Sequence, residues 1–219
     1  MKKQGKVYLI GAGPGDPGLL TLKGRDCLAE ADAVVYDRLA DPRILGWVRP
    51  EAERIYVGKA SAQHTMKQED INKLLVKLAS EGKIVARLKG GDSFVFGRGG
   101  EEALLLKENG LPFEFIPGIT SAISVPEYAG IPVTHRKVAA SFAVITGHED
   151  PSREQSGINW QGLAKGVDTL IFLMGVENLK HISARLIEHG RPAETPAALI
   201  RWGTHPEQRT LITTLGNAY

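Results

Sequence analysis

One segment of the sequence has residue types and spacing suited to ligand chemistry, Gly90-Gly-Asp-Ser-Phe-Val-Phe-Gly-Arg-Gly-Gly-Glu-Glu102. Its five glycines in thirteen residues allow positive φ angles and let a ligand approach the backbone closely. An apolar run at 84–88 precedes it and predicts a strand, whereas the run at 101–106 that follows is typical of a helix. Asp92 therefore stands just beyond the carboxyl end of a strand, where open α/β sheets bind their ligands. The segment predicts a ligand-binding loop.

A second glycine-rich loop, Gly11-Ala-Gly-Pro-Gly-Asp-Pro-Gly18, follows the first predicted strand. The dinucleotide fingerprint Gly-x-Gly-x-x-Gly would require glycine at position 16, where Asp16 stands. Pro14 has no N–H and Asp16 adds a negative charge, so both residues are unsuited to a loop that wraps a pyrophosphate. The loop favours a ligand that has no phosphate or that carries a positive charge, and a plain tight turn is the alternative.

The composition is that of an ordinary globular protein with one large domain or two small ones. Hydrophobic residues make up 42% of the 219 residues, and the net charge of +2 is too small to argue for nucleic acid. No apolar run approaches the ~20 residues needed to span a bilayer. The single cysteine, Cys27, excludes an internal disulfide and fits a reducing cytoplasm. We therefore expect a cytoplasmic protein that binds neither nucleic acid nor a membrane.

Short apolar strands alternate with helix-like segments, which indicates an α/β architecture with a largely parallel sheet. The segment 131–136 breaks this pattern and predicts a link between two domains, 1–131 and 136–219, and 149–159 predicts an exposed loop. The predicted strands are 6–10, 33–36, 84–88, 113–116, 142–146, 169–173 and 197–201. The predicted helices are 19–31, one through Ile71 and Leu78 that stops at Gly82, one from Glu101, one at 121–128, and one through Leu179 and Leu186.

Three segments coincide in order and spacing with those of one enzyme family. They are Gly11-Ala-Gly-Pro-Gly-Asp16, Val34-Val-Tyr-Asp-Arg38 and the long glycine-rich segment 90–102, and together they resemble the tetrapyrrole methylase family. Shorter matching pieces extend this resemblance over essentially the whole chain: Val57-Gly-Lys59, Pro117-Gly-Ile-Thr-Ser121, Gly130-Ile-Pro-Val-Thr-His-Arg136, Thr146-Gly-His148, Leu173-Met-Gly175 and Trp202-Gly-Thr204.

The resemblance implies a two-domain α/β fold with a mostly parallel N-terminal sheet and a mixed C-terminal sheet. It implies that S-adenosylmethionine binds in the cleft between the domains, that S-adenosylhomocysteine is the product, and that the protein is a homodimer. This cofactor has a sulfonium cation and no phosphate, in agreement with the loop at 11–18. The cofactor-binding residues that the resemblance implies are Pro14, Gly90, Gly91, Asp92, Val95, Thr120, Ser121, Met174 and Gly203.

The implied reaction is methylation of uroporphyrinogen III at two pyrrole β-carbons, C2 and C7, through precorrin-1 to precorrin-2, in sirohaem or cobalamin biosynthesis. Asp37 and Lys59 match the family's proton acceptor and proton donor; a turn-capping aspartate and a solvated lysine are the alternatives. The substrate carries many carboxylates, so we expect several basic residues to bind it, each of which could instead form a structural ion pair. The candidates are Arg38, Arg98, His135, Arg136 and Arg201.

Other functions stay open beside this one. A methylase acting at another corrin position is the nearest alternative, and a nicotinamide-dependent oxidoreductase is an alternative from a different class that Asp37 would suit and Asp16 would not. We expect no metal, because His148-Glu149-Asp150 has no partner histidine at helical spacing and no nearby thiolate. The family usually continues past the position of Tyr219, so we also expect a truncated C-terminal domain.

Overall fold

The computed structural model describes residues 5–58, 66–149 and 156–219. The chain divides into two compact units, Met1–Ser121 (unit 1) and Ala122–Tyr219 (unit 2), and each is considered by itself. The division falls earlier in the chain than the predicted link at 131–136, because the helix that starts at Ser121 packs within unit 2: Val125 lies against Gly203.

Unit 1 is built on a five-stranded sheet in the order β3-β2-β4-β1-β5, and every neighbouring pair of strands is parallel. Parallel neighbours require crossover connections, and helices supply most of these here. The strands are β1 (Lys6–Gly11), β2 (Ala33–Tyr36), β3 (Glu53–Tyr56), β4 (Ile84–Lys89) and β5 (Phe113–Ile116). The helices are α1 (Leu22–Glu30), α2 (Gln68–Ser80) and α3 (Gly99–Glu108), with short 3-10 helices η1 (Pro17–Leu19) and η2 (Pro42–Trp47).

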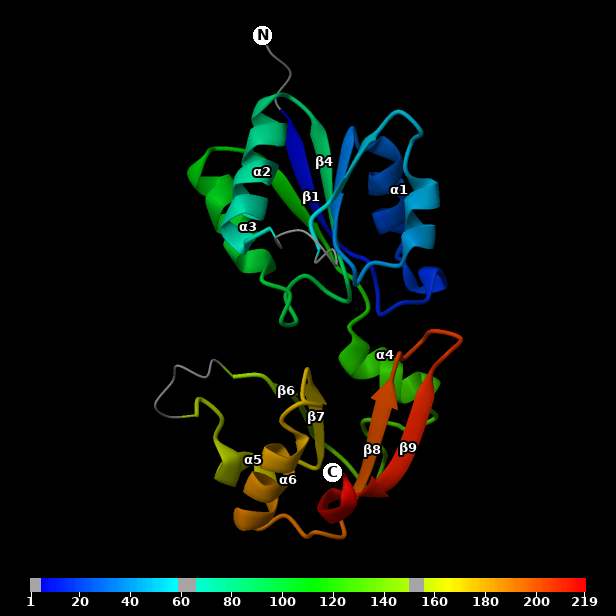
Figure 1. The fold of residues 1–219 in the computed structure, drawn as a ribbon, viewed down its shortest axis with the longest axis vertical. Helices are drawn as coiled ribbons and strands as arrows, with labels where there is room; N and C mark the ends of the chain where they lie inside the picture. The colour runs from blue at the N-terminus through cyan, green and yellow to red at the C-terminus, as the bar shows by residue number, and fades with distance from the viewer. Residues whose placement is uncertain (1–4, 59–65, 150–155) are drawn as a thin grey trace. The chain divides into compact units, whose positions relative to one another are not determined.

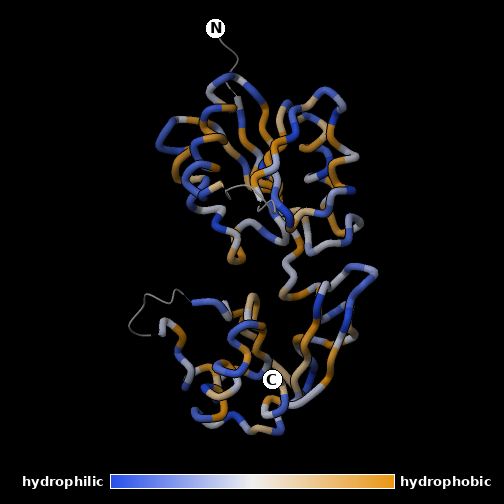
Figure 2. The backbone as a smooth tube through the Cα atoms, viewed as in Figure 1, coloured by the Kyte–Doolittle hydropathy of each residue, from blue (hydrophilic) through white to orange (hydrophobic). Residues whose placement is uncertain are grey.

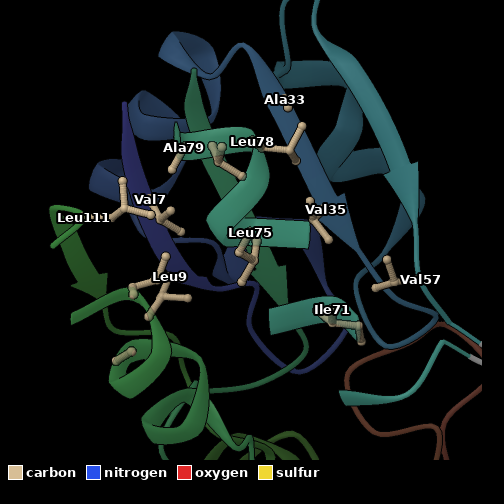
Figure 3. Packing of buried hydrophobic residues seen from close by; sticks show 13 residues of the cluster. Val7, Leu9, Ala33, Val35, Val57, Ile71, Leu75, Leu78, Ala79 and Leu111 are labelled. Atoms are coloured by element: carbon tan, nitrogen blue, oxygen red, sulfur yellow. The ribbon is translucent and has the colours of Figure 1, made fainter. Parts of the chain in front are cut away.

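Helices cover both faces of this sheet, α2 and α3 on one face and α1 with η2 on the other (Figure 1). Alternate residues of each strand point to opposite faces, so Val7 and Leu9 pack with Leu75 and Leu78 of α2 (Figure 3). Val85 of β4 belongs to the same cluster. The next residues along the same strands, such as Ile10 and Ala86, pack on the α1 face. Both faces of the interior strands are therefore largely apolar, and hydrophobic stretches follow these strands in Figure 2.

Unit 2 contains two short sheets rather than one continuous sheet. β6 (Phe142–Thr146) and β7 (Thr169–Leu173) are parallel, whereas β8 (Pro196–Arg201) and β9 (Arg209–Thr214) are antiparallel. Trp160, Ile182 and Leu186 form its apolar core with Leu215. Its helices are α4 (Ser121–Tyr128), α5 (Trp160–Gly166), α6 (Leu179–Glu188) and the 3-10 helix η3 (Leu215–Asn217). The predicted α/β class with a mostly parallel N-terminal sheet is confirmed. In place of the predicted mixed C-terminal sheet, unit 2 has one parallel and one antiparallel pair of strands in its described residues.

Two differences from the predicted elements have local causes. The first helix begins at Leu22 and not at residue 19, because Thr21 caps it by accepting a hydrogen bond from the amide of Gly24, and a separate 3-10 turn precedes it. The edge strand β3 was not predicted, because Glu-Arg-Ile-Tyr is mostly polar and exposed and shows no apolar run.

Glu114 on β5 gives a pH-dependent contribution to folding that can be measured directly. Hydrogen bonds from Lys23 and Lys6 lower the pKa of Glu114 to about 2. Because the folded pKa lies below the unfolded value of roughly 4.3, this stabilisation is present above about pH 4.3 and is lost as the pH falls toward 2. The stability of Glu114→Gln should therefore vary less with pH between 4.3 and 2 than that of the parent. Side-chain NMR titration checks the pKa, and a Glu114 pKa near 4.3 would contradict the expectation.

Candidate functional site

The loops after β1, β4 and β5 meet in a contact between backbones that we call the glycine junction, formed by Gly11, Gly13, Gly91 and Gly118. The amide of Gly91 donates to the carbonyl of Gly13 at 2.7 Å, and the amide of Gly13 donates to the carbonyl of Gly91 at 3.2 Å. The strands β4, β1 and β5 are neighbours in the parallel sheet, so the junction lies at the carboxyl edge, where such sheets bind ligands.

The junction requires glycine because the backbones approach too closely for a side chain. A Cβ atom on Gly118 would lie 2.3 Å from the carbonyl oxygen of Gly91, and one on Gly11 would lie 2.5 Å from the Cα atom of Gly118. Gly91 differs, because it has a φ of +68° and the direction of its missing Cβ is open. The junction is thus tightly packed inside and leaves bare backbone at Gly91 for a ligand to approach.

Asp92 uses both carboxylate oxygens to hold this junction together. Its Oδ1 accepts hydrogen bonds from the amides of Phe94 at 2.8 Å and Val95 at 3.3 Å, and its Oδ2 accepts from the amide of Gly118 at 3.1 Å. The amides of Gly13 and Gly91 each donate to the carbonyl oxygen of the other residue. Phosphate-binding loops offer backbone N–H groups to the ligand. Here the amides of all five residues donate hydrogen bonds within the protein, so this region is poorly suited to binding a pyrophosphate.

Asp37 lies in the loop after β2, next to the glycine junction. Its Oδ1 accepts a hydrogen bond from the amide of Leu39 at 3.0 Å, and its Oδ2 accepts one from Nη2 of Arg87 at 3.2 Å. The missing Cβ of Gly90 is what lets this loop come close, because a Cβ there would lie 2.4 Å from Cβ of Leu39. Asp37 caps a turn, as one interpretation of the sequence expected, and its side chain also keeps 25% exposure for contact with a ligand.

A buried charge cluster lies behind Asp37, made of Arg87 and Lys89 on β4, Glu102 on α3 and Gln68 on α2. Oε1 of Glu102 accepts three hydrogen bonds, from Nε of Arg87 at 3.1 Å, Nζ of Lys89 at 2.9 Å and Nε2 of Gln68 at 3.1 Å. Burial, and then the charge of Arg87, lowers the pKa of Lys89. We did not predict this cluster from the sequence; the signal was the alternation of two basic residues in an otherwise apolar strand, Ile-Val-Ala-Arg-Leu-Lys.

The predicted substrate-binding residues are exposed and are divided between the two units. Arg38 and Arg98 belong to unit 1, and Arg98 forms a two-point ion pair with Glu101 at 2.8 and 2.7 Å. His135, Arg136 and Arg201 belong to unit 2, where the guanidinium of Arg201 stacks 3.8 Å from the ring centroid of Trp202. The predicted proton donor, Lys59, lies outside the described residues.

The predicted cofactor residues likewise divide between the units. Pro14, Gly90, Gly91, Asp92 and Val95 lie at or beside the glycine junction of unit 1, and Thr120 and Ser121 follow it in the chain.

In unit 2, Met174 is exposed at the end of β7 with a φ of +59°, beside an open hollow of about 360 Å³ that it lines with His148, Val176 and Glu177. Gly203 packs against Val125, which a Cβ would approach to 2.3 Å. A smaller open hollow of about 180 Å³ is lined by Trp202, which precedes Gly203 in the sequence, and by His205 and Glu207.

The described residues contain no group of three or more His, Cys, Asp or Glu side chains that could hold a metal ion. None of their helices is long and apolar enough to cross a membrane.

The sequence is similar to one protein family over nearly its whole length. A model of the tetrapyrrole (corrin/porphyrin) methylases matches residues 6–219. A uroporphyrinogen-III C-methyltransferase of Priestia megaterium is 56% identical over 212 residues, which cover 97% of this chain and 89% of that protein. A siroheme synthase of Azotobacter vinelandii is 53% identical over 215 residues, which cover 98% of this chain and 46% of that protein.

Among solved structures, a uroporphyrin-III C-methyl transferase from Thermus thermophilus complexed with S-adenyl homocysteine matches with a TM-score of 0.83 and 41% identity. The match covers 97% of this chain and 90% of that one. The fold is thus that of an α/β methyltransferase. The chain belongs to the tetrapyrrole methylase family, which confirms the family and the enzyme class that the three sequence segments predict.

Proposed function

We propose that this chain methylates uroporphyrinogen III with S-adenosylmethionine at two pyrrole β-carbons, C2 and C7, and so forms precorrin-2 through precorrin-1. The observation that carries the proposal is a partly exposed carboxylate, Asp37, beside a glycine junction whose amides are already paired. Asp37 is the proton acceptor of this proposal, and the glycine junction suits a cofactor without phosphate. Identity of 56% over nearly the whole chain to a uroporphyrinogen-III C-methyltransferase supports this choice of substrate.

The junction fits S-adenosylmethionine better than a dinucleotide. Its amides are engaged, Asp16 adds a carboxylate to the loop after β1, and the open backbone at Gly91 offers a surface for close approach. When bound, this cofactor supplies an electrophilic methyl group on a sulfonium centre. We propose that Pro14, Gly90, Gly91, Asp92, Val95, Thr120 and Ser121 of unit 1 and Met174 and Gly203 of unit 2 bind it.

The work left to the protein is orientation and proton transfer. The pyrrole carbon is itself the nucleophile, so the protein needs to hold the carbon in line with the methyl group, and such orientation can supply several kcal/mol. A proton must then leave the methylated ring system. Each oxygen of Asp37 accepts one described hydrogen bond, and a carboxylate oxygen has a second lone pair with which Asp37 could accept that proton. Lys59 is the proposed proton donor, which returns a proton to the substrate.

The carboxylates of the substrate call for cationic partners. Arg38, Arg98, His135, Arg136 and Arg201 are the proposed partners, and all five are exposed. Exposed ion pairs contribute only about 0–1 kcal/mol each, so we propose that several act together. Arg98 would have to exchange Glu101 for a substrate carboxylate.

The decisive experiment is anaerobic incubation with methyl-labelled S-adenosylmethionine and freshly reduced uroporphyrinogen III, followed by mass analysis of the tetrapyrrole. A product heavier by two methyl groups, with label at C2 and C7 by NMR, supports the proposal. Methylation of a different corrinoid, with none of uroporphyrinogen III, would replace it by the nearest alternative. The branch served, sirohaem or cobalamin, and the proposed homodimer and cytoplasmic location require separate measurements.

Ligand-dependent thermal stability separates the methyltransferase from an oxidoreductase. S-adenosylhomocysteine at 100 times its Kd should stabilise the folded protein by roughly 2.7 kcal/mol by mass action, and should raise the unfolding midpoint by several degrees. NAD at the same concentration should leave the midpoint unchanged, because the junction amides are already paired. Differential scanning fluorimetry with both ligands checks this, and a rise with NAD alone would overturn the assignment.

A further inference from the structure

The strand β4 carries two charged residues where an ordinary buried strand carries apolar ones. The side chains of Arg87 and Lys89 are only 3% and 6% exposed, and that of Glu102 is fully buried. Burying charges carries a large desolvation cost, and well-packed hydrophobic residues would often stabilise a fold at least as well. Stability alone therefore gives no reason for this buried charge cluster.

Glu102 anchors the cluster with one oxygen. Its Oε1 accepts the hydrogen bonds from Arg87, Lys89 and Gln68, whereas its buried Oε2 has no hydrogen-bond partner among the described residues. Gln68 is in turn held by Asn72, one turn further along α2, at 2.9 Å. Glu102 is thus fixed by strand and helix together, and its charge lies in contact with both cations.

Each of the three guanidinium nitrogens of Arg87 donates a hydrogen bond to a different residue. Nε donates to Glu102, Nη1 donates to the carbonyl of Leu88 at 3.0 Å, and Nη2 donates to Oδ2 of Asp37 at 3.2 Å. The first two contacts fix the plane of the guanidinium inside the protein. The third is the one contact among these that reaches a partly exposed side chain, because Asp37 is 25% exposed. The cluster therefore ends at Asp37.

The charges of the cluster balance only when Asp37 is included. Arg87 and Lys89 carry two positive charges, and Glu102 and Asp37 carry two negative charges. The amide of Leu39 holds the other oxygen of Asp37. The carboxylate is thus oriented from both sides, from its own turn and from the buried cluster.

We propose that Arg87 is the positioning residue for Asp37, and that Glu102 acts on Asp37 through Arg87. This inference rests on the proposed role of Asp37 as proton acceptor. The fork of the guanidinium cannot be reproduced by the single ammonium of lysine, so Arg87→Lys keeps the charge and loses the orientation. Glu102→Gln keeps an oxygen acceptor and loses the charge that holds Arg87 in place.

The test measures Arg87→Lys in the parent and in an Asp37→Asn background. A misplacement near 1 Å can cost about 10²-fold, so we expect kcat to fall by about 10- to 100-fold in the parent with KM for S-adenosylmethionine unchanged. If Arg87 acts through Asp37, the same change should have almost no further effect on kcat when Asp37 is already asparagine. Equal losses in both backgrounds would overturn the inference. Glu102→Gln should repeat the pattern, and it covers the case in which Arg87→Lys fails to fold.

A second readout needs no substrate. The amide proton of Leu39 reports the orientation of Asp37, so its hydrogen exchange should become faster in Arg87→Lys while amides of α1 stay unchanged. The matched control is Arg49→Lys, since Arg49 also binds an aspartate, Asp32, at 2.7 Å together with the backbone carbonyl of Ala31. That variant should change neither kcat nor Leu39 exchange. If the parent does not methylate uroporphyrinogen III, the proposed function fails and Leu39 exchange alone decides the inference: unchanged exchange in Arg87→Lys overturns it.

Discussion

Replacing Asp37 by asparagine is expected to lower kcat for methyl transfer by roughly 10²- to 10⁴-fold, the contribution typical of a positioned proton acceptor. Asparagine has one acceptor oxygen, so it can keep the hydrogen bond from Leu39 or that from Arg87 but not both. Binding of S-adenosylhomocysteine should remain, because the glycine junction is held by Asp92 and not by Asp37. Calorimetry for binding and labelled methyl transfer for turnover measure the two effects separately.

The chain offers a close control for this variant. Asp41 accepts a hydrogen bond from the amide of Arg43 at 2.8 Å and pairs with the Arg43 guanidinium at 2.9 Å, so it shares with Asp37 a turn cap and an arginine partner, while Arg43 is exposed and lies outside the buried charge cluster. Asp41→Asn should therefore leave kcat close to that of the parent. Near-normal turnover in Asp37→Asn would remove Asp37 from the mechanism, and an equal loss in both variants would assign the effect to stability.

The second large effect is expected at Gly118. An alanine Cβ there would lie 2.3 Å from the carbonyl oxygen of Gly91 and 2.6 Å from Gly11, and neither backbone can turn aside as a side chain could. Overpacking of this kind costs about 1–3 kcal/mol, and occasionally more. We expect a lower free energy of unfolding in urea and weaker binding of S-adenosylhomocysteine, because the displaced strand ends carry Gly91 and Asp92.

Gly100 in α3 provides the comparison for Gly118→Ala. A Cβ at Gly100 meets no atom within 4 Å, and alanine favours a helix by up to about 1 kcal/mol over glycine. Gly100→Ala should therefore leave the unfolding free energy unchanged or slightly higher. If Gly118→Ala is as stable as Gly100→Ala and binds the ligand equally well, the junction is less closely packed than the structure indicates.

The elements that the sequence predicted well are those whose signal is local. Apolar runs such as 84–88 predicted the interior strands, and the spacing of Ile71 and Leu78 predicted α2, because one buried face imposes its period on the residues. Elements whose formation depends on neighbours were missed: the edge strand β3, the strand β9, and α5, which has seven residues with a glycine inside it and another at its end.

In the candidate site, too, features with a local sequence signal were predicted and features that depend on distant residues were not. The loops could be placed from the sequence because glycine and aspartate follow apolar runs at the expected ends of strands. The partnership of Arg87, Glu102 and Asp37 could not, because its two hydrogen-bonded pairs are fifteen and fifty residues apart and come together only through strand pairing and helix packing. The roles of Asp92 and Gly118 were also hidden, since their hydrogen bond joins loops 26 residues apart.

The two buried cations of β4 also bear on how this strand finds its partners during folding. A strand shifted by one residue turns every side chain to the opposite face of the sheet. For β4, that shift would move Arg87 and Lys89 into the apolar cluster beneath α1 and would leave the carboxylate of Glu102 buried without a cation. Uncompensated buried charge costs about 3–5 kcal/mol when one partner of a pair is lost. The same residues that hold Asp37 therefore penalise misaligned pairing of the central strand.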